Sequence, residues 1–332
     1  MRIAAVLVLL VACGDDGSSA TPIDAPPSDV PPDMTPDMVD AFVAPTAPAG
    51  HYHYVIDRLL VPETNAQARD YALDLDGNGV VDNQLGMVFG TLAAMGMGVT
   101  DATTRAIDRG ESITLVDLVT TDLTTSATAS VALFASDAST PAACANAADT
   151  VCRRHLAGTG AFTTLAVPVD PPLPGAFAAG TFTAGPGALS LPLVWPQPFR
   201  VALLGARMKI TAASASSLGS VVIAGGITTP EIQATIIPKI RDGFQASVTA
   251  DCPTTTTPPL CGCPGGSAGA TALALFDGSD GTAKDCAISI AEVRDNSLIQ
   301  SLLAPDVMIN GVQALSVGVN ARAVLAAFAD PI

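Results

Sequence analysis

The chain has 332 residues and a formal net charge of -16; 49% of its residues are hydrophobic and only 4% are aromatic. This length suffices to bury the core of one large domain or of two small ones. The acidic balance argues against nucleic acid and anionic membrane surfaces as partners, whereas it is compatible with cations.

The first residues have the layout of a secretory signal peptide. Arg2 precedes an apolar run that ends in the sequence LVAC at residues 10–13, and the run is too short to span a bilayer. LVAC resembles the lipobox of bacterial lipoproteins, in which the cysteine is lipidated and becomes the mature N-terminus. The resemblance implies a signal peptide at residues 1–12 and an acyl anchor on Cys13. Because Gly14 follows the cysteine, it also implies an outer-membrane location, on the periplasmic face or at the cell surface.

A segment rich in aspartate and proline follows the predicted lipid anchor. Residues 14–48 contain eight prolines and seven aspartates but no lysine or arginine. Such a segment buries too little apolar surface to offset its chain entropy. We therefore expect residues 13–50 to form a disordered, extended tether that carries the anchor.

Residues 51–332 are expected to form the globular body, either as one unit or as an α/β part at 51–160 and a β-rich part at 161–332. Residues 51–62 alternate and favour a strand, and residues 112–136 have the pattern of two strands. Short apolar runs with proline and glycine between them fill residues 162–226. The sequence thus predicts an α+β fold that is mainly β, a β-sandwich or partial barrel with a few flanking helices.

The segment that begins DLDGNGVVD has oxygen-bearing groups at alternating positions, with a glycine at the sixth place for a sharp turn. This pattern resembles the EF-hand loop and the related loops of dockerins and thrombospondin type 3 repeats. The resemblance implies a Ca²⁺ site whose ligands are Asp74, Asp76, Asn78, the Val80 carbonyl and Asp82. The twelfth place is Leu85 instead of a bidentate acid, so we expect weak binding or a ligand from elsewhere. The alternative is a turn that ends in Asp82 as the N-cap of the next helix.

A second segment near the C-terminus carries part of the same pattern. Asp285, Ser289 and Glu292 occupy what would be places five, nine and twelve, although the first half of the pattern is missing. We expect these residues either to form a second metal site or to complete the first one. The alternative is a capped helix, because Ser289 and Glu292 have the spacing of a capping box.

Six cysteines follow Cys13, and an even number outside the cytoplasm predicts three disulfides. The spacing of Cys144 and Cys152 favours a local bridge. The remaining four can pair in three ways. Zinc is a rival ligand for the CGC sequence, but no histidine follows His155. The predicted disulfide residues are Cys144, Cys152, Cys252, Cys261, Cys263 and Cys286.

Little in the sequence supports an enzyme. Ser267 lies in a GxSxG pattern, but the pattern follows a cysteine-rich turn and no histidine lies downstream. His51 and His53 share one face of the expected first strand, as a metal pair would, yet no third ligand is evident. We therefore expect a packing or surface role for both histidines.

The body as a whole resembles uncharacterised lipoproteins of Gram-negative bacteria, through the Asp/Pro tether, the DxDxxG loop and the C-terminal DC.I...E segment. That resemblance implies no particular activity. We expect a lipid-anchored envelope protein that acts as a calcium-stabilised binding or envelope-interaction module, with outer-membrane lipid and a protein or polysaccharide as partners. A hydrolase of envelope polymers and a structural envelope protein are the alternatives.

Overall fold

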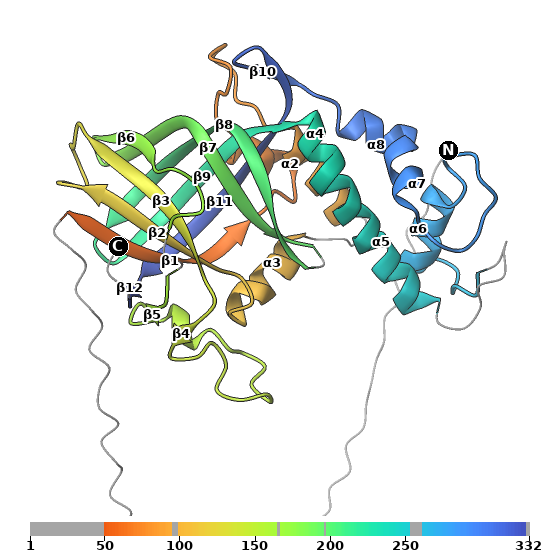
Figure 1. Cartoon of the computed structure of the whole chain (residues 1–332), viewed down its shortest axis with the longest axis horizontal. Coiled ribbons are helices and arrows are strands. Elements are labelled where there is room, and N and C mark those ends of the chain that lie inside the picture. The colour runs from red at the N-terminus through yellow and green to blue at the C-terminus, as the bar shows by residue number, and fades with distance from the viewer. Residues whose placement is uncertain (1–49, 95–98, 165–166, 196, 253–260, 330–332) are drawn as a thin grey trace, which may run out of the picture. The chain divides into compact units, whose positions relative to one another are not determined.

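The computed structural model describes residues 50–94, 99–164, 167–195, 197–252 and 261–329, which belong to a compact unit running from Val43 to Ile332 (Figure 1). The predicted signal peptide at 1–12, Cys13 and the tether up to residue 49 lie outside the described residues. Within the described ranges, no helix combines the length and the apolar character needed to cross a membrane.

The body is mainly β, as the sequence predicts, and is built on a large antiparallel sheet of nine strands. Because β1 pairs with β11 as well as with β2, every strand of this nine-stranded sheet except β10 belongs to a closed ring. The sequence allows a sandwich or a partial barrel, and the structure shows a barrel that is closed. The strands, in spatial order, are β1 (His51–Leu60), β2 (Ile113–Thr120), β3 (Ala129–Ser136), β6 (Leu173–Ala178), β7 (Thr181–Val194), β8 (Pro198–Ser214), β9 (Ser217–Thr228), β11 (Val312–Leu325) and β10 (Val307–Ile309).

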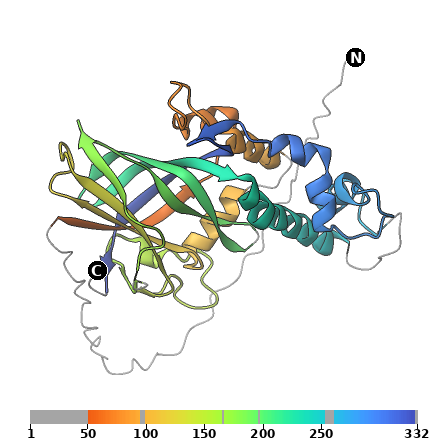
Figure 2. The same cartoon turned by 45° about the horizontal axis from the view of Figure 1, so that its top comes forward.

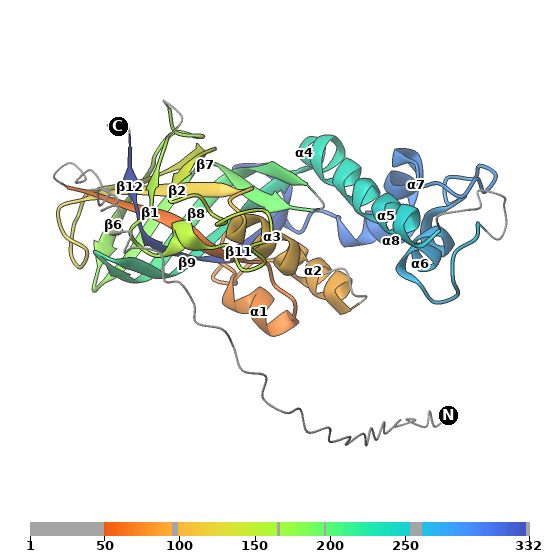
Figure 3. The same ribbon diagram turned by 90° about the horizontal axis from the view of Figure 1, so that it is seen from below.

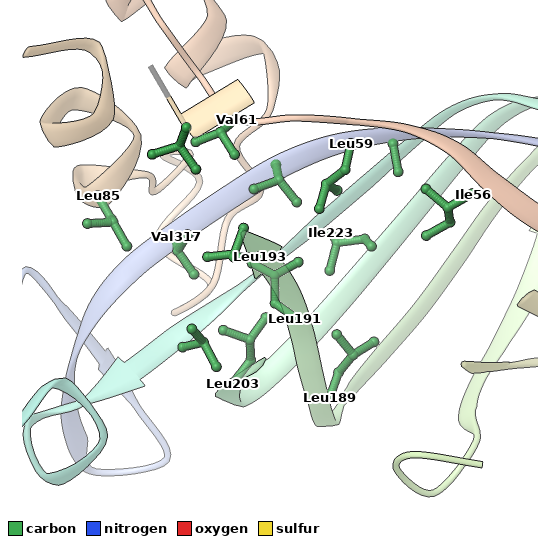
Figure 4. Close-up of a cluster of buried hydrophobic side chains, with 14 of the residues drawn as sticks. Ile56, Leu59, Val61, Leu85, Leu189, Leu191, Leu193, Leu203, Ile223 and Val317 are labelled. Atoms are coloured by element: carbon green, nitrogen blue, oxygen red, sulfur yellow. The ribbon is translucent and has the colours of Figure 1, made fainter. Parts of the chain in front are cut away.

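Branched apolar side chains fill the space that the closed sheet encloses (Figure 4). Leu189 and Leu191 share one face of β7 because strand side chains alternate, and Leu189 pairs with Leu203 of β8. Leu191, Ile223 and Val317 are at most 1% exposed. A ring of eight strands encloses a space that side chains can just fill. The interior is therefore a packed core that holds the strands in register.

A small second sheet covers the outer side of β1 to β3. It consists of β12 (Ala327–Phe328), β5 (Ala161–Phe162) and β4 (Ser139–Thr140). Phe328 stacks on His53 of β1, with ring centroids 3.9 Å apart, and meets Phe134 of β3 edge to face. As a consequence β2 is buried on both faces along almost its whole length.

Two groups of helices flank the sheet (Figure 2). The first group lies between β1 and β2 in the chain, and the second lies between β9 and β10 and extends from one end of the sheet (Figure 3). Strands from both 51–160 and 161–332 join the same ring. The first group is α1 (Asn65–Asp70), α2 (Gln84–Ala94) and α3 (Val99–Asp108); the second is α4 (Thr229–Glu231), the π-helical η2 (Ile232–Ile236), α5 (Ile237–Asp251), α6 (Ala268–Phe276), α7 (Ile290–Asp295) and α8 (Ser297–Leu302).

The helix from α4 to α5 runs through a proline without a break. Proline lacks a backbone N–H and its ring crowds the preceding turn, so the sequence pattern suggests a kink or an end near Pro238. The helix does not end there: the five residues of η2 form a π-helical turn that precedes Ile237, and α5 continues through Pro238. A π turn widens the backbone spiral where the regular hydrogen bond is lost, which lets the helix continue.

Three disulfides tie the loops to these elements. Cys144 is bonded to Cys152, while Cys252 is bonded to Cys263 and Cys261 to Cys286. The second bond links the end of α5 to the segment before α6, and the third links that segment to the one before α7. Tertiary structure thus selects one of the three pairings that the sequence leaves open for these four cysteines.

A buried ion network fixes the loop closed by the Cys144 disulfide to the barrel. Asp57 of β1 is only 6% exposed, and its Oδ2 lies 3.6 Å from Arg153 Nη2. Arg153 also pairs with Asp108 at the end of α3. Its backbone N–H donates to the Asp108 carbonyl at 2.9 Å. The Arg153 guanidinium therefore pairs with carboxylates of two elements, β1 and α3.

Replacing Arg153 by methionine keeps most of the side-chain volume but leaves Asp57 buried without its cation. We expect Arg153→Met to lower the free energy of unfolding by about 1–3 kcal/mol, the usual cost of stranding a buried polar group. This is less than for a wholly buried pair, because the Arg153 side chain is 29% exposed. Denaturant unfolding measures the loss. The exposed neighbour Arg154 supplies the matched control, Arg154→Met; an equal loss in both variants contradicts the network's role.

Candidate metal centres

The segment predicted to bind Ca²⁺ forms an irregular loop between α1 and α2, closed by a bridge between Leu73 and Asp82. The loop is attached to the body by Leu75, which is 3% exposed and packs against residues of β9, β10 and β11. Arg207 of β8 also donates a hydrogen bond to the Leu75 carbonyl at 3.5 Å. The base of the loop is therefore anchored while its tip faces solvent.

Within this loop, three of the five predicted ligands lie close together. Carboxylate oxygens of Asp74, Asp76 and Asp82 all lie within 4.8 Å of one another. Asn78 donates to an Asp76 oxygen through its amide at 3.0 Å and accepts from the Val80 N–H at 2.7 Å. The side chain of Val80 is exposed. The arrangement presents oxygen ligands, which a hard cation such as Ca²⁺ prefers.

Backbone N–H groups hold all three carboxylates in place, and Asp76 accepts from Asn78 at 3.1 Å. Asp74 accepts from Gly79 at 2.9 Å and from Gly77 at 2.7 Å, and Asp82 accepts from Leu75 at 2.8 Å. Gly79 has a φ of +84°, in the left-handed region that favours glycine, and its N–H thereby turns toward Asp74. The glycine at the sixth place serves the geometry that the sequence pattern predicts.

The pKa values of two loop carboxylates, Asp74 and Asp82, are shifted in opposite directions. The hydrogen bond from Gly79, followed by that from Gly77, holds the pKa of Asp74 below its ordinary value. Burial raises the pKa of Asp82, and the neighbouring charges of Asp76 and Asp306 raise it further. The ionised form of Asp82 is thus disfavoured in this environment.

The helix that follows the loop is capped by Asn83, which corrects the expectation that Asp82 is the N-cap. Asn83 Oδ1 accepts from the Gly86 N–H at 3.0 Å and from the Gly318 N–H at 2.8 Å. Its amide donates to two carbonyls, so the buried side chain links α1, α2 and β11. Leu85, at the twelfth place of the pattern, is 2% exposed in the core and has no ligand atom. The Asp82 carboxylate consequently stays with the loop.

The second predicted segment is organised around a helix cap. Ser289 Oγ accepts from the Glu292 N–H at 3.1 Å, and Glu292 Oε2 accepts from the Ser289 N–H at 2.7 Å. The other oxygen of Glu292 accepts from Gly278, and Asp285 accepts from Ala287. Glu292 is 3% exposed and is therefore held at α7; the structure does not bring it to the Asp74 loop, which lies beside β10 (Figure 1).

Two other chemical candidates from the sequence have structural roles. The sulfurs of Cys261 and Cys286 are bonded to each other, so they are not thiolate ligands even though Asp277 lies beside them. Ser267 is the N-cap of α6, where its Oγ accepts from the Ala270 N–H. It follows a turn instead of the strand that a nucleophile elbow requires.

One residue that the sequence reasoning missed joins the two histidines of the first strand. Asp117 of β2 lies opposite His53 of β1 in the sheet register, and the Asp117 carboxylate lies beside His51 and His53. The available signal was a single charge inside the apolar run ITLVDLVT. This charge indicates a site only in combination with the pairing of β1 and β2, which places Asp117 beside the two histidines.

Comparison with known proteins does not bear on any of these sites. The chain matches no protein-family model, no curated protein and no solved structure. Their chemistry therefore has to be inferred from geometry alone.

Proposed function

We propose that this protein is a lipid-anchored envelope protein whose barrel acts as a binding or envelope-interaction module and is stabilised by Ca²⁺ in the Asp74 loop. The observation that carries the calcium part is the convergence of the Asp74, Asp76 and Asp82 carboxylates within 4.8 Å. The envelope part rests on the lipobox-like LVAC sequence and on the acidic tether that follows it.

The energetic basis of the calcium proposal is the burial of Asp82 together with repulsion between the loop carboxylates. Burial raises the pKa of Asp82 most, and the charges of Asp76, Asp306 and Asp74 raise it further. A divalent cation replaces that repulsion by attraction and binds the folded chain in preference to the unfolded one. With Leu85 at the twelfth place, we expect a dissociation constant of roughly 10⁻⁴ to 10⁻³ M.

Calcium binding is tested by thermal unfolding of the full chain with 10 mM Ca²⁺ and with chelator. At this excess a site of the expected affinity adds about 1.4–2.7 kcal/mol, which raises the Tm by roughly 3–10 °C. Asp74→Asn removes a ligand charge and should abolish most of the shift. Equal melting temperatures with Ca²⁺ and with chelator, together with no uptake in a calcium titration, reject the proposal.

A contrasting result is expected for the acid at α7. Glu292→Gln loses an acceptor for one of two backbone N–H groups, so we expect about 1–2 kcal/mol less stability with or without calcium. Calcium affinity should stay unchanged, because Glu292 is engaged by Gly278 and Ser289. A weaker calcium affinity in this variant shows instead that Glu292 completes the loop site.

The raised pKa of Asp82 makes the effect of one substitution depend on calcium. A raised pKa in the folded state means that ionisation of Asp82 costs stability as the pH rises through that range. Asp82→Asn removes this cost and keeps an oxygen for the Leu75 N–H. Near pH 7, in chelator, the free energy of unfolding of the variant should therefore equal or exceed that of the parent chain. In Ca²⁺ it should be lower than that of the parent. A lower stability of the variant in both solutions, or a higher one in both, contradicts a metal role for Asp82.

Proton competition predicts the pH dependence of calcium binding. Ca²⁺ needs the ionised carboxylate, so affinity should fall as the pH drops through the pKa of Asp82, which lies above its ordinary value of 3.8. Calcium titrations of the full chain between pH 7 and pH 4 measure this loss. In Asp82→Asn, the residual affinity should decline only at lower pH.

A further inference from the structure

A separate cluster of two histidines and an aspartate, residue types that can bind metal ions, lies on the outer face of β1 and β2. His51 and His53 share a face of β1 because they are two residues apart, and Asp117 is the cross-strand partner of His53. One ligand atom from each of the three residues lies within 4.8 Å of the other two. Two imidazoles and one carboxylate thus converge from neighbouring strands.

Two of the interatomic distances in this cluster lie within about half an ångström of those between ligands of one metal ion. Asp117 oxygens lie 2.9 and 3.0 Å from His51 Nδ1, and Asp117 Oδ1 lies 3.6 Å from His53 Nε2. Around a tetrahedral zinc ion with bonds of about 2.1 Å, neighbouring ligand atoms are about 3.4 Å apart. Shifts of a few tenths of an ångström along these two edges would bring them to that value.

One buried atom of the cluster, His53 Nε2, has no hydrogen-bond partner among the described residues, and the Asp117 carboxylate shares a single partner, His51 Nδ1. His53 is 4% exposed, and its Nε2 is buried without any hydrogen bond. Asp117 is 3% exposed, and in the described part of the chain its carboxylate is hydrogen-bonded by His51 alone. Buried polar groups in native proteins are nearly always paired, so each such exception calls for a cause. A cation between the two residues satisfies both of them.

The protonation and orientation of His53 suit a metal ligand. Burial lowers the pKa of His53 to about 4, with a contribution from His51, so its imidazole is neutral at physiological pH. Its ring stacks on Phe328 with an interplanar angle of 4°, which fixes the direction of Nε2. A neutral ring held in one orientation is preorganised to bind a metal ion.

We propose that His51 Nδ1, His53 Nε2 and the Asp117 carboxylate bind a divalent transition-metal ion, Zn²⁺, whose fourth position is open to solvent beside His51. The His51 side chain is 26% exposed, whereas His53 and Asp117 are buried, so the opening lies on the His51 side. Imidazole ligands favour zinc and its neighbours over calcium. Three protein ligands with one open position form the coordination of zinc sites that bind water or a substrate.

This site is independent of the Asp74 loop in ligand chemistry and in place. The loop offers oxygens from one short segment, whereas the zinc site combines nitrogen and oxygen from two strands. The competing explanation is that His51 and Asp117 form an ordinary pair joining β1 to β2.

Zinc titration of the full chain, free of any histidine tag and in the presence of Ca²⁺ to occupy the loop, tests the proposal. We expect one Zn²⁺ per chain. His51→Ala and Asp117→Asn should each weaken binding at least 10- to 100-fold, the range already seen when an outer partner of a metal ligand is lost. Because the His51 side chain is partly exposed, His51→Ala should retain the fold, which circular dichroism verifies.

Two control variants separate the site from the rest of the molecule. His155→Gln replaces a buried histidine outside the cluster, and Asp74→Asn alters only the oxygen loop; both should bind zinc as the parent chain does. Absence of saturable zinc binding, unchanged affinity in His51→Ala, or loss of binding in Asp74→Asn alone overturns the proposal. Cobalt absorption typical of nitrogen and oxygen ligands, lost in His51→Ala, gives a second readout of the same site.

Discussion

The structure of this protein depends on the pairing of β1 with β11, two strands that are far apart along the chain and neighbours in the sheet. Their backbone groups pair from Tyr54 with Leu325 to Leu60 with Asn320. Without this ladder both strands would present unpaired N–H and C=O groups at the edge of an open sheet. Closure satisfies those groups and encloses apolar side chains of β7, β8 and β9 in the core. The remaining features of the body are attached to the ring that results.

Closure also explains why β1 presents buried polar residues, His53 and Asp57, on its outer face. Alternate residues of β1 face outward, and the small sheet containing Phe328 covers part of that face. The polar groups beneath this cover need partners, because buried charges and hydrogen-bonding atoms are costly without them. Asp57 pairs with Arg153 and Asp117 pairs with His51, whereas His53 Nε2 has no hydrogen-bond partner among the described residues. The proposed zinc ion would be the missing partner of His53 Nε2.

The two candidate metal centres differ in what builds them. The Asp74 loop is local, since its carboxylates lie within nine residues and are held by N–H groups of the same loop. The cluster around Asp117 exists only through strand pairing and a covering layer, so it requires the folded barrel. The first is oxygen-rich and partly solvated, and the second mixes nitrogen with a buried carboxylate. These differences are the reason that we propose a hard cation for the first centre and a borderline one for the second.

The sequence by itself determined the features that depend on neighbouring residues: the mainly β composition, the close approach of Asp74, Asp76 and Asp82, and the cap formed by Ser289 and Glu292. Tertiary structure alone decided that the sheet closes, how Cys252, Cys261, Cys263 and Cys286 pair, and that Asp117 meets His51 and His53. Spacing along the chain specifies turns, caps and strand faces because these involve residues a few positions apart. Register between distant strands is set by the packing of the whole core, which no local pattern contains.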